Sequence, residues 1–454
     1  MPSLAPPLAR LLAPLAALLL SLSLVASAVP AAQAAPKPNP VTPGDLTGYG
    51  FDQCVAPTQA AMDRWLETSP FLSVGIYISG ASRGCRDQPN LTPSWVRTQL
   101  RKGWRLLPIT LGPQASCQPS FPRYGNDPTI DPAAGSSGRY PRAREMGRTE
   151  AGRAVAAARA LGLTPGSTLW YDLEAFDVTN TACRESALSF LSAWTTRLHE
   201  LGWVSGVYSS AASGIKALDD ARVNRPKAFA LPDQVWIARW DGVANTSTSY
   251  LRDDGWRPGG RVKQYRGGHN ETHGGVTINI DSNFLDLGKG SVAPAEERCG
   301  GVRVDFRAYP LLRRPAAGYT APAAHTTALQ CLLQEKGLHD GALNGVYDQR
   351  TAAAVASWRE RRGISAGDEA GRTVWMSLLS AGRKPVLKVG SAGSQVRRVQ
   401  RALNAASPGT RLRPRGVMNP ATAAALRAWQ GRVDLPATGI VTRDDWAALL
   451  RGRA

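Results

Sequence analysis

The sequence predicts an α/β protein: a (β/α)8 TIM-like barrel followed by two small three-helix domains. Between Asp45 and Gly290, apolar strand-like segments alternate with helical patterns. Several of these strands end in polar residues, as they do at the mouth of such barrels. After Cys299, the chain repeats itself at an offset of 71 residues. A chain of 454 residues has room for two to four domains of this kind.

The chain begins with a segment typical of protein export. Arg10 precedes Leu11–Val25, which is almost entirely Leu and Ala, and Ala26–Ala28 and Ala32–Ala34 both fit the small-x-small cleavage pattern. A membrane anchor is the alternative, but the apolar run is short and two cleavage patterns follow it. We therefore predict that residues 1–34 form a signal peptide and that the mature protein is secreted, without an integral membrane span.

The barrel domain is expected over residues 45–290. The expected strands are Tyr49–Asp52, Ser73–Ile78, Arg105–Leu111, Thr168–Glu174, Ser205–Ser209, Gln234–Arg239, Arg261–Tyr265 and Thr277–Asp281. The expected helices are Thr58–Thr68, Pro93–Lys102, Thr149–Leu161 and Ala182–Leu201, with poor helices after the sixth strand. A doubly wound open sheet is the alternative, but no glycine-rich phosphate loop favours it.

Acidic residues end the first, fourth and eighth of these strands. Asp172 and Glu174 are two positions apart on one strand, so their side chains point the same way, toward Asp52 and Asp281 at the barrel mouth. Glycosidic cleavage needs an acid, together with a carboxylate or substrate group that stabilises positive charge. Crowded carboxyls can supply both, because crowding raises some pKa values. We assign Glu174 as general acid and Asp172 as the electrostatic or base partner, with Asp52 and Asp281 positioning substrate and tuning both.

Other residues near the strand ends are weaker candidates. Six of them are either sugar contacts or core residues: Tyr77, Gln114, Tyr208, Trp236, Arg239 and Gln264. His269 and His273 flank Glu271 in a glycine-rich segment, which we interpret as a mobile loop near the cleft rather than a zinc site. The Gly/Pro-rich stretch Gly112–Pro141 is a second loop, expected to cover the substrate. No metal or cofactor is expected.

The six cysteines are expected to form disulfides: Cys54, Cys85, Cys117, Cys183, Cys299 and Cys331. An even number in an exported chain favours three bonds, and none of the cysteines lies in a Cys-x-x-Cys pair. A long gap separates the first four from the last two, which suggests Cys299–Cys331. Among the first four the pairing stays open, and Cys54–Cys85 with Cys117–Cys183 is favoured.

Two repeats follow, over residues 299–381 and 386–451. Their shared anchors are Thr351, Trp358 and Trp375 in the first copy, and Thr422, Trp429 and Trp446 in the second. Leu329-Gln330 likewise matches Val399-Gln400. Each copy is expected to form a helix, a turn, a second helix capped by the Thr, and a short third helix. We expect the tryptophans to be core residues rather than ligand platforms.

The net charge of +19 is concentrated in the repeats. Residues 300–454 hold 24 Lys and Arg against 10 Asp and Glu, a net charge of +14, whereas residues 41–299 carry only +3. Such a field attracts polyanions, and the sequence contains no nucleic-acid-binding motif. The expected partners are therefore peptidoglycan and anionic cell-wall polymers, not nucleic acid. The alternative is a solvated basic surface with no partner.

Both parts of the chain resemble known families. Residues 45–290 resemble the exported glycoside-hydrolase-like domain of unknown function found in high-GC bacteria, a relative of family 25 lysozymes. The matching motifs include Gly50-Phe51-Asp52-x-Cys54, Gly75-Ile76-Tyr77-Ile78-Ser79-Gly80, Tyr171-Asp172-x-Glu174, Gly206-Val207-Tyr208-Ser209 and Ile280-Asp281. The resemblance implies an acidic cluster at Asp52, Asp172, Glu174 and Asp281.

The repeats resemble the small three-helix peptidoglycan-binding domain. The matching elements are Leu329-Gln330, Asn344-Gly345-Val346-Tyr347 before Thr351, Trp429-Gln430, and Thr438-Gly439-Ile440-Val441 before Trp446. The first copy departs from the pattern at Arg359, which follows Trp358, and the second has a degraded turn before Thr422.

Three hypotheses follow. The leading one is a secreted, wall-associated, muramidase-like hydrolase of peptidoglycan that two C-terminal modules target to the wall. The second is a non-catalytic glycan-binding protein on the same barrel, and the third is an envelope-remodelling protein whose basic repeats hold wall polymers. We expect the protein to be a monomer.

Overall fold

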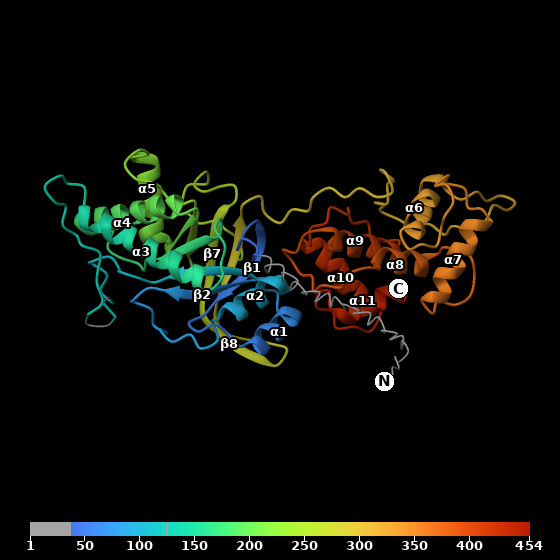
Figure 1. Cartoon of the computed structure of the whole chain (residues 1–454), viewed down its shortest axis with the longest axis horizontal. Helices are drawn as coiled ribbons and strands as arrows, with labels where there is room; N and C mark the ends of the chain where they lie inside the picture. The colour runs from blue at the N-terminus through green and yellow to red at the C-terminus, as the bar shows by residue number, and fades with distance from the viewer. Residues whose placement is uncertain (1–37, 121, 124–125) are drawn as a thin grey trace, which may run out of the picture. The chain divides into compact units, whose positions relative to one another are not determined.

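The computed structural model describes residues 38–120, 122–123 and 126–454 (Figure 1). Their elements form a closed eight-stranded barrel followed by a helical C-terminal part, as the sequence predicts. The predicted signal peptide, residues 1–34, lies outside the described residues. Among the residues that are described, no helix combines the length and apolar character that crossing a bilayer requires.

The barrel strands pair in chain order around the closed sheet. They are β1 (Leu46–Asp52), β2 (Ser73–Ser79), β3 (Arg105–Thr110), β4 (Thr168–Asp172), β5 (Val204–Ser210), β6 (Gln234–Ala238), β7 (Gly260–His273) and β8 (Val276–Leu287). The helices between them are α1 (Gln59–Thr68), α2 (Pro93–Lys102), α3 (Pro141–Ala160), α4 (Thr181–Glu200) and α5 (Lys216–Asn224), the last preceded by the π-helical turn η1 (Ala211–Ile215). No helix follows β6 within the described part of the barrel, where poor helices were expected.

The last strand, β8, runs in the opposite direction to the eighth strand of a (β/α)8 barrel. Strands β1 to β7 are parallel, but β8 is antiparallel to both β7 and β1, so the expectation of a short parallel strand at Thr277–Asp281 is wrong. The cause is the turn between β7 and β8: Gly274 and Gly275 have φ values of 56° and 80°. Two left-handed residues make a tight hairpin, whereas a parallel crossover needs a dozen residues or more. His269 and His273 therefore lie in a regular hairpin and not in the expected mobile loop.

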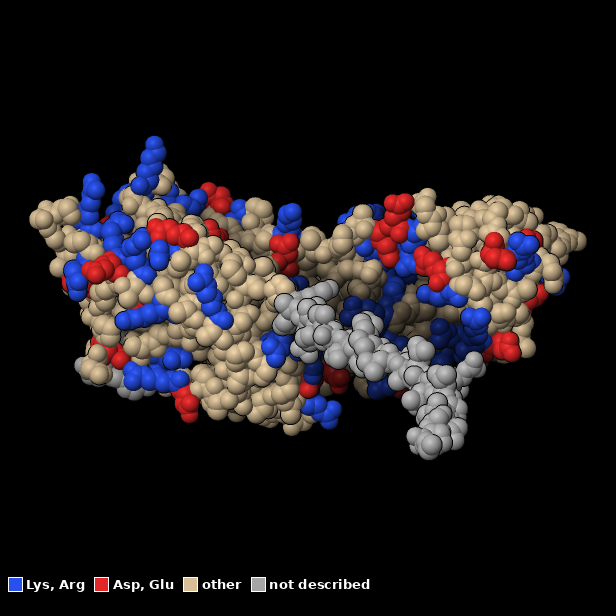
Figure 2. Space-filling model, viewed as in Figure 1, with Lys and Arg blue, Asp and Glu red and all other residues tan. Residues whose placement is uncertain are grey.

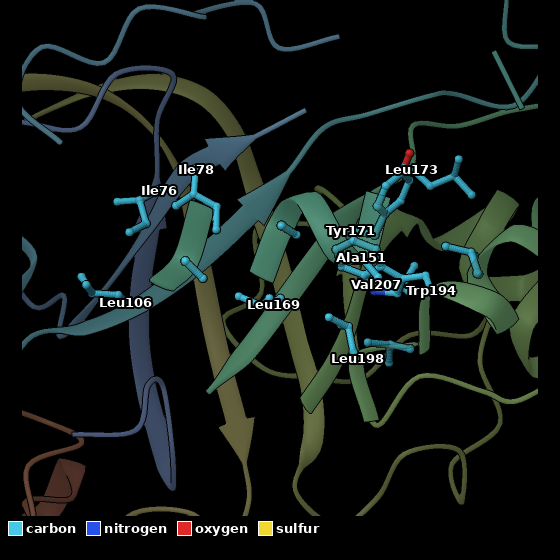
Figure 3. Packing of buried hydrophobic residues seen from close by; sticks show 14 of the residues in the cluster. Ile76, Ile78, Leu106, Ala151, Leu169, Tyr171, Leu173, Trp194, Leu198 and Val207 are labelled. Carbon is cyan, nitrogen blue, oxygen red and sulfur yellow. The ribbon is translucent and has the colours of Figure 1, made fainter. Parts of the chain in front are cut away.

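Side chains along the strands alternate between the barrel interior and the surrounding helices. On β4, Leu169 and Tyr171 belong to the core shared with the helices, and Figure 3 shows Tyr171 beside Trp194 of α4, with ring centroids 5.0 Å apart. Trp170 belongs instead to the separate interior cluster. Asp172 is next in this alternation, so it points into the barrel.

An apolar layer fills the barrel beneath its mouth. Its buried residues are Leu46, Leu72, Leu107, Ile109, Trp170, Trp236, Val262, Leu285 and Leu287. Tyr77 and Tyr208 pack against this layer with their rings. The interior is therefore a packed core, and the polar residues at its open end form a floor for a pocket.

The three predicted disulfides are present: Cys54–Cys85, Cys117–Cys183 and Cys299–Cys331. The second bond ties the loop before α3 to the first turn of α4.

Helix α3 begins at Pro141, eight residues before the expected Thr149, and so adds two turns to the predicted helix.

Each repeat folds into three helices around a common core. The first copy forms α6 (Ala323–Gln334), α7 (Gln349–Arg361) and α8 (Arg372–Ser380), and the second forms α9 (Ser394–Ala406), α10 (Pro420–Arg432) and α11 (Arg443–Leu450). The four repeat tryptophans are buried in this core, which confirms their expected role: Trp358, Trp375, Trp429 and Trp446.

A buried glutamine explains the Leu-Gln and Val-Gln anchors. Gln330 accepts a hydrogen bond from the backbone N of Gly345 (3.0 Å) and donates to Val346 O (3.0 Å) and Thr351 Oγ1 (3.1 Å). Gln400 makes the corresponding three bonds in the second copy. The anchor thus ties the first helix to the turn and to the second helix.

The predicted Thr caps of the second helices are wrong by three positions. The N-caps are Asp348 and Asn419, whose side chains accept from the backbone N of Thr351 (2.8 Å) and Thr422 (2.9 Å). Each Thr hydroxyl also donates to its cap. The Thr therefore recurs in both copies because its hydroxyl hydrogen-bonds both the N-cap side chain and the buried glutamine.

Candidate active site

The four acidic residues singled out in the sequence lie at one end of the barrel. Asp52 is the last residue of β1 and Asp172 the last of β4, with Glu174 two residues further on. Asp281 lies within β8 and not at its end, but antiparallel pairing places it directly opposite Asp52. The register thus brings Asp281 to the mouth even though its strand runs in the unexpected direction.

A pocket of about 280 Å³ opens at this end. Asp52, Glu174 and Asp281 line it, together with Tyr77 of β2. Arg123, from the loop expected to cover the substrate, also lines it. One small pocket therefore holds three carboxyl groups and a guanidinium, the charged groups that acid–base chemistry on a polar substrate requires.

Asp52 and Asp281 act as a pair. Asn283 donates to Asp52 Oδ1 (2.6 Å), and the amide of Gln264 donates to both Asp52 oxygens and to Asp281 Oδ2, each at 3.3 Å. Burial and the charge of Asp281 raise the pKa of Asp52 to about 8. Burial raises the pKa of Asp281 to about 6, against the opposing charge of His269. At neutral pH the pair therefore keeps one proton and carries one negative charge.

Asp172 lies beneath the pocket, and Glu174 lies in it. Asp172 is 2% exposed and accepts a hydrogen bond from Tyr77 Oη (3.3 Å). Its Oδ1 has no partner among the described residues. Burial and the charges of Glu174 and Asp52 raise its pKa well above the ordinary value. Burial also raises the pKa of Glu174, with Arg123 opposing, so Glu174 keeps its proton to a higher pH than an ordinary glutamate.

Gln114 explains why the chain holds Glu174 at the mouth. Its Nε2 donates to Asp172 O and its Oε1 accepts from the backbone N of Glu174, both at 2.8 Å. The Gln114 amide therefore supplies hydrogen bonds to the backbone just beyond the end of strand β4. Gln114 is fully buried, so it positions Glu174 and is not the sugar contact that the sequence suggested.

The four remaining candidates do not line the pocket. Tyr208 donates to Gln264 Oε1 (3.0 Å), so both belong to the hydrogen-bond network of the carboxyl pair. Trp236 is 1% exposed and donates to Asn283 Oδ1 (2.7 Å), which makes it a core residue and not a sugar contact. The guanidinium of Arg239 stacks on the ring of Tyr250, 5.3 Å from its centroid, and does not line the pocket.

Asn283 was missed in the sequence. It lies two residues after Asp281 on β8 and so faces the same side of the strand. The alternation of polar residues at positions 281 and 283 was readable, but the expected strand stopped at Asp281.

The His-x-Glu-x-His segment forms a hydrogen-bonded cluster on one face of β7. His269 and His273 each contact one oxygen of Glu271 through Nε2, at 3.0 and 2.9 Å. Both imidazoles are thus engaged by the same carboxylate, an arrangement that supports the hairpin at the rim of the pocket.

Two family models match the chain. Residues 63–285 match the Rv2525c-like, glycoside hydrolase-like domain, and residues 392–449, the second repeat, match the putative peptidoglycan binding domain. The first match includes Asp172, Glu174 and Asp281 and begins after Asp52. No curated protein is significantly similar to the chain.

Solved structures also align with the chain. The Tat-secreted protein Rv2525c of Mycobacterium tuberculosis is 13% identical, with 54% of this chain and 98% of that chain covered and a TM-score of 0.35. An uncharacterized B. stearothermophilus protein is 18% identical, covering 52% and 95%, with a TM-score of 0.33. The Clostridium perfringens spore cortex lytic enzyme SleM is 12% identical, covering 59% and 81%, with a TM-score of 0.34.

The first matched segment covers the barrel from within α1 to near the end of β8, without β1, and the second lies within the second repeat. Residues 63–285 are therefore similar to an Rv2525c-like, glycoside hydrolase-like domain, and residues 392–449 are similar to a peptidoglycan-binding domain.

Proposed function

We propose that the protein is an exported, monomeric cell-wall enzyme that hydrolyses the glycan strands of peptidoglycan as a muramidase does. The observation that carries the proposal is the lining of one pocket by Asp52, Glu174 and Asp281, whose pKa values are all raised. This arrangement supplies a neutral acid and an anion side by side near neutral pH, which is what glycosidic cleavage requires.

Each carboxyl has a distinct role in this proposal. Glu174 donates its proton to the glycosidic oxygen as the bond to the sugar carbon breaks. Asp281, ionised at neutral pH, stabilises the positive charge on that carbon, directly or by orienting a substrate group. Water then adds to the carbon and returns a proton to Glu174. Asp52 stays protonated and hydrogen-bonded in the network that holds Asp281.

The role of Asp172 differs from the one its sequence position suggested. It lies beneath the pocket and does not line it, so the anionic role passes to Asp281. Asp172 instead supports Tyr77, which lines the pocket. The carboxylate of Asp172 accepts a hydrogen bond from the Tyr77 hydroxyl.

The C-terminal part targets the barrel to the wall in this account. Its second repeat matches a peptidoglycan-binding domain, and we extend that role to the first repeat because the two share the same glutamine-centred scaffold. The three disulfides are typical of exported proteins.

Some of the basic excess is structural. Arg398 is buried and donates to Arg383 O (2.7 Å), and Arg401 is buried against Asp305 (2.6 Å) and Glu296 (2.7 Å). Other Lys and Arg side chains are exposed and interleaved with acidic ones on both parts of the chain (Figure 2). The exposed Lys and Arg side chains are therefore the part of the basic excess that a wall polymer can contact directly.

Retention on purified walls should fall by about threefold or more between 0.05 and 0.5 M NaCl, without disappearing. Salt screens the attraction of exposed Lys and Arg to anionic polymers, whereas contacts to the glycan itself are little affected. The measurement is the fraction of full-length protein that pellets with walls, before and after wall teichoic acid or similar anionic polymers have been stripped. Retention independent of salt on both wall preparations would show that the basic field has no part in targeting.

The direct test of the proposal uses the mature protein and purified peptidoglycan. We expect the turbidity to fall and new reducing ends to appear, with N-acetylmuramic acid identified at those ends after borohydride reduction. Properly folded protein that releases no reducing ends over pH 4 to 9 contradicts the proposal.

The second candidate is a glycan-binding protein without turnover. It is favoured by one observation: Asn283, Gln264 and Tyr77 already satisfy carboxyl oxygens of the cluster from within the protein. This candidate predicts wall retention by the wild type and by Glu174→Gln alike, and no reducing ends from either.

A further inference from the structure

One tryptophan of the barrel is exposed. Trp240, just after β6, has 66% of its surface exposed, and it is the most exposed large apolar side chain among the described residues. All thirteen tryptophans of the chain lie in the described residues, and no other is exposed to this degree. Single apolar residues on a surface are ordinary, so its significance depends on how the ring is held.

The ring is fixed in one orientation. Trp240 Nε1 donates to Gln264 Oε1 (2.9 Å), the same amide whose nitrogen contacts Asp52 and Asp281. One face of the indole rests on Gly267, where a Cβ would come within 2.5 Å of the ring atom Cε2. Only glycine admits the ring at this distance, and most of the residue's surface stays exposed to solvent.

The backbone beneath the ring is also braced. Lys263 is buried, and its Nζ donates to Asp241 Oδ1 (3.1 Å), Asn245 Oδ1 (2.8 Å) and Ser247 O (3.1 Å). The backbone N of Gly242 donates to Tyr265 O (2.9 Å). The loop that carries Trp240 is therefore tied to β7, and little conformational freedom remains to be lost when a ligand binds.

The ring lies next to the carboxyl pocket. Gly268 follows Gly267 and lines the pocket, and a Cβ at Gly268 would lie 4.0 Å from Asp281 Oδ1. The backbone of Gly267 and Gly268 thus connects the position under the indole to the lining of the carboxyl pocket.

We infer that Trp240 is a stacking platform for a sugar ring, forming a binding subsite beside the carboxyl pocket. A flat aromatic side chain that is rigid and largely exposed suits the C–H face of a pyranose, and the carboxyl groups of the adjacent pocket suit its hydroxyls. The ligand class, an N-acetylated hexosamine unit of a glycan strand, rests on the proposed function. The subsite itself rests on the geometry of Trp240, Gln264 and Gly267.

The test measures binding without turnover. Chitotetraose is titrated into the full mature chain carrying Glu174→Gln, and tryptophan fluorescence is followed. We expect saturable quenching or a blue shift, and about tenfold or greater loss of affinity on adding Trp240→Ala. Trp240→Phe should retain part of the affinity. Gly267→Ala, which displaces the ring without removing it, should weaken binding as Trp240→Ala does.

The matched control is Val243→Ala, an exposed apolar residue on the same loop. It should leave the affinity unchanged. Equal affinity for Trp240→Ala and its parent, measured by calorimetry, overturns the inference, and so does a parent that does not bind chitotetraose at all. If binding depends on Trp240 but the wild type releases no reducing ends, the subsite stands and the hydrolase proposal fails. If hydrolysis proceeds with the same KM after Trp240→Ala, the subsite fails and the hydrolase proposal stands.

Discussion

Replacing Glu174 with glutamine should lower the rate of reducing-end release by about 10²–10⁴-fold and leave wall retention unchanged. Glutamine keeps the shape of the side chain, and the backbone N of residue 174 still donates to Gln114, so the chain beyond β4 keeps its position. What is lost is the proton for the leaving oxygen. The measurement is kcat/KM on solubilised peptidoglycan strands at pH 7.

The control is Glu145→Gln on α3, an exposed glutamate whose partner is the exposed Arg142. It should retain at least half of the wild-type rate. A rate for Glu174→Gln within about threefold of wild type would remove Glu174 from the chemistry, since a positioned general acid contributes far more than that.

Replacing Asp52 with asparagine should stabilise the barrel, by roughly 2–4 kcal/mol more at pH 9 than at pH 5. Asp52 is 4% exposed, and its pKa is raised from 3.8 to about 8, so the folded state holds a proton that the unfolded state has already lost. The wild type therefore loses stability as pH rises from about 4 to about 8. Asparagine does not titrate and keeps an oxygen for Asn283, so the variant escapes this loss.

Urea unfolding of both proteins at the two pH values measures the difference in free energy of unfolding. Asp87→Asn, a change at an exposed aspartate of the same domain, is the control and should alter stability equally at both pH values. The same stabilisation of Asp52→Asn at pH 5 and pH 9 would mean that Asp52 ionises normally in the folded protein.

Local sequence signals were sufficient for much of this fold. The spacing of Asp172 and Glu174 predicted that both would lie at the barrel mouth, and they do, although β4 ends at Asp172 and the side chain of Gln114 positions Glu174. The gap between the fourth and fifth cysteines isolated Cys299–Cys331. The constant offset of 71 residues between the repeats placed both three-helix units and the buried tryptophans.

Other features depend on long-range pairing that a local pattern does not encode. The direction of β8 follows from the left-handed Gly274-Gly275 turn, and its length follows from pairing with β1 on its other edge. Trp236 and Gln114 were candidate sugar contacts because they lie near strand ends. Their burial depends on which neighbours they contact. Trp236 contacts Asn283, and Gln114 contacts the end of β4.

The proposed catalysis requires a neutral carboxyl lying beside an ionised one in the barrel mouth at neutral pH. The most direct measurement is a ¹³C titration of the side-chain carboxyls in protein labelled at aspartate, with Asp52→Asn and Asp281→Asn used to assign the signals. We predict transitions near pH 6 for Asp281 and near pH 8 for Asp52. If both carboxyls instead titrate below about pH 5, as exposed aspartates do, the pocket does not separate their charges and the proposed mechanism is contradicted.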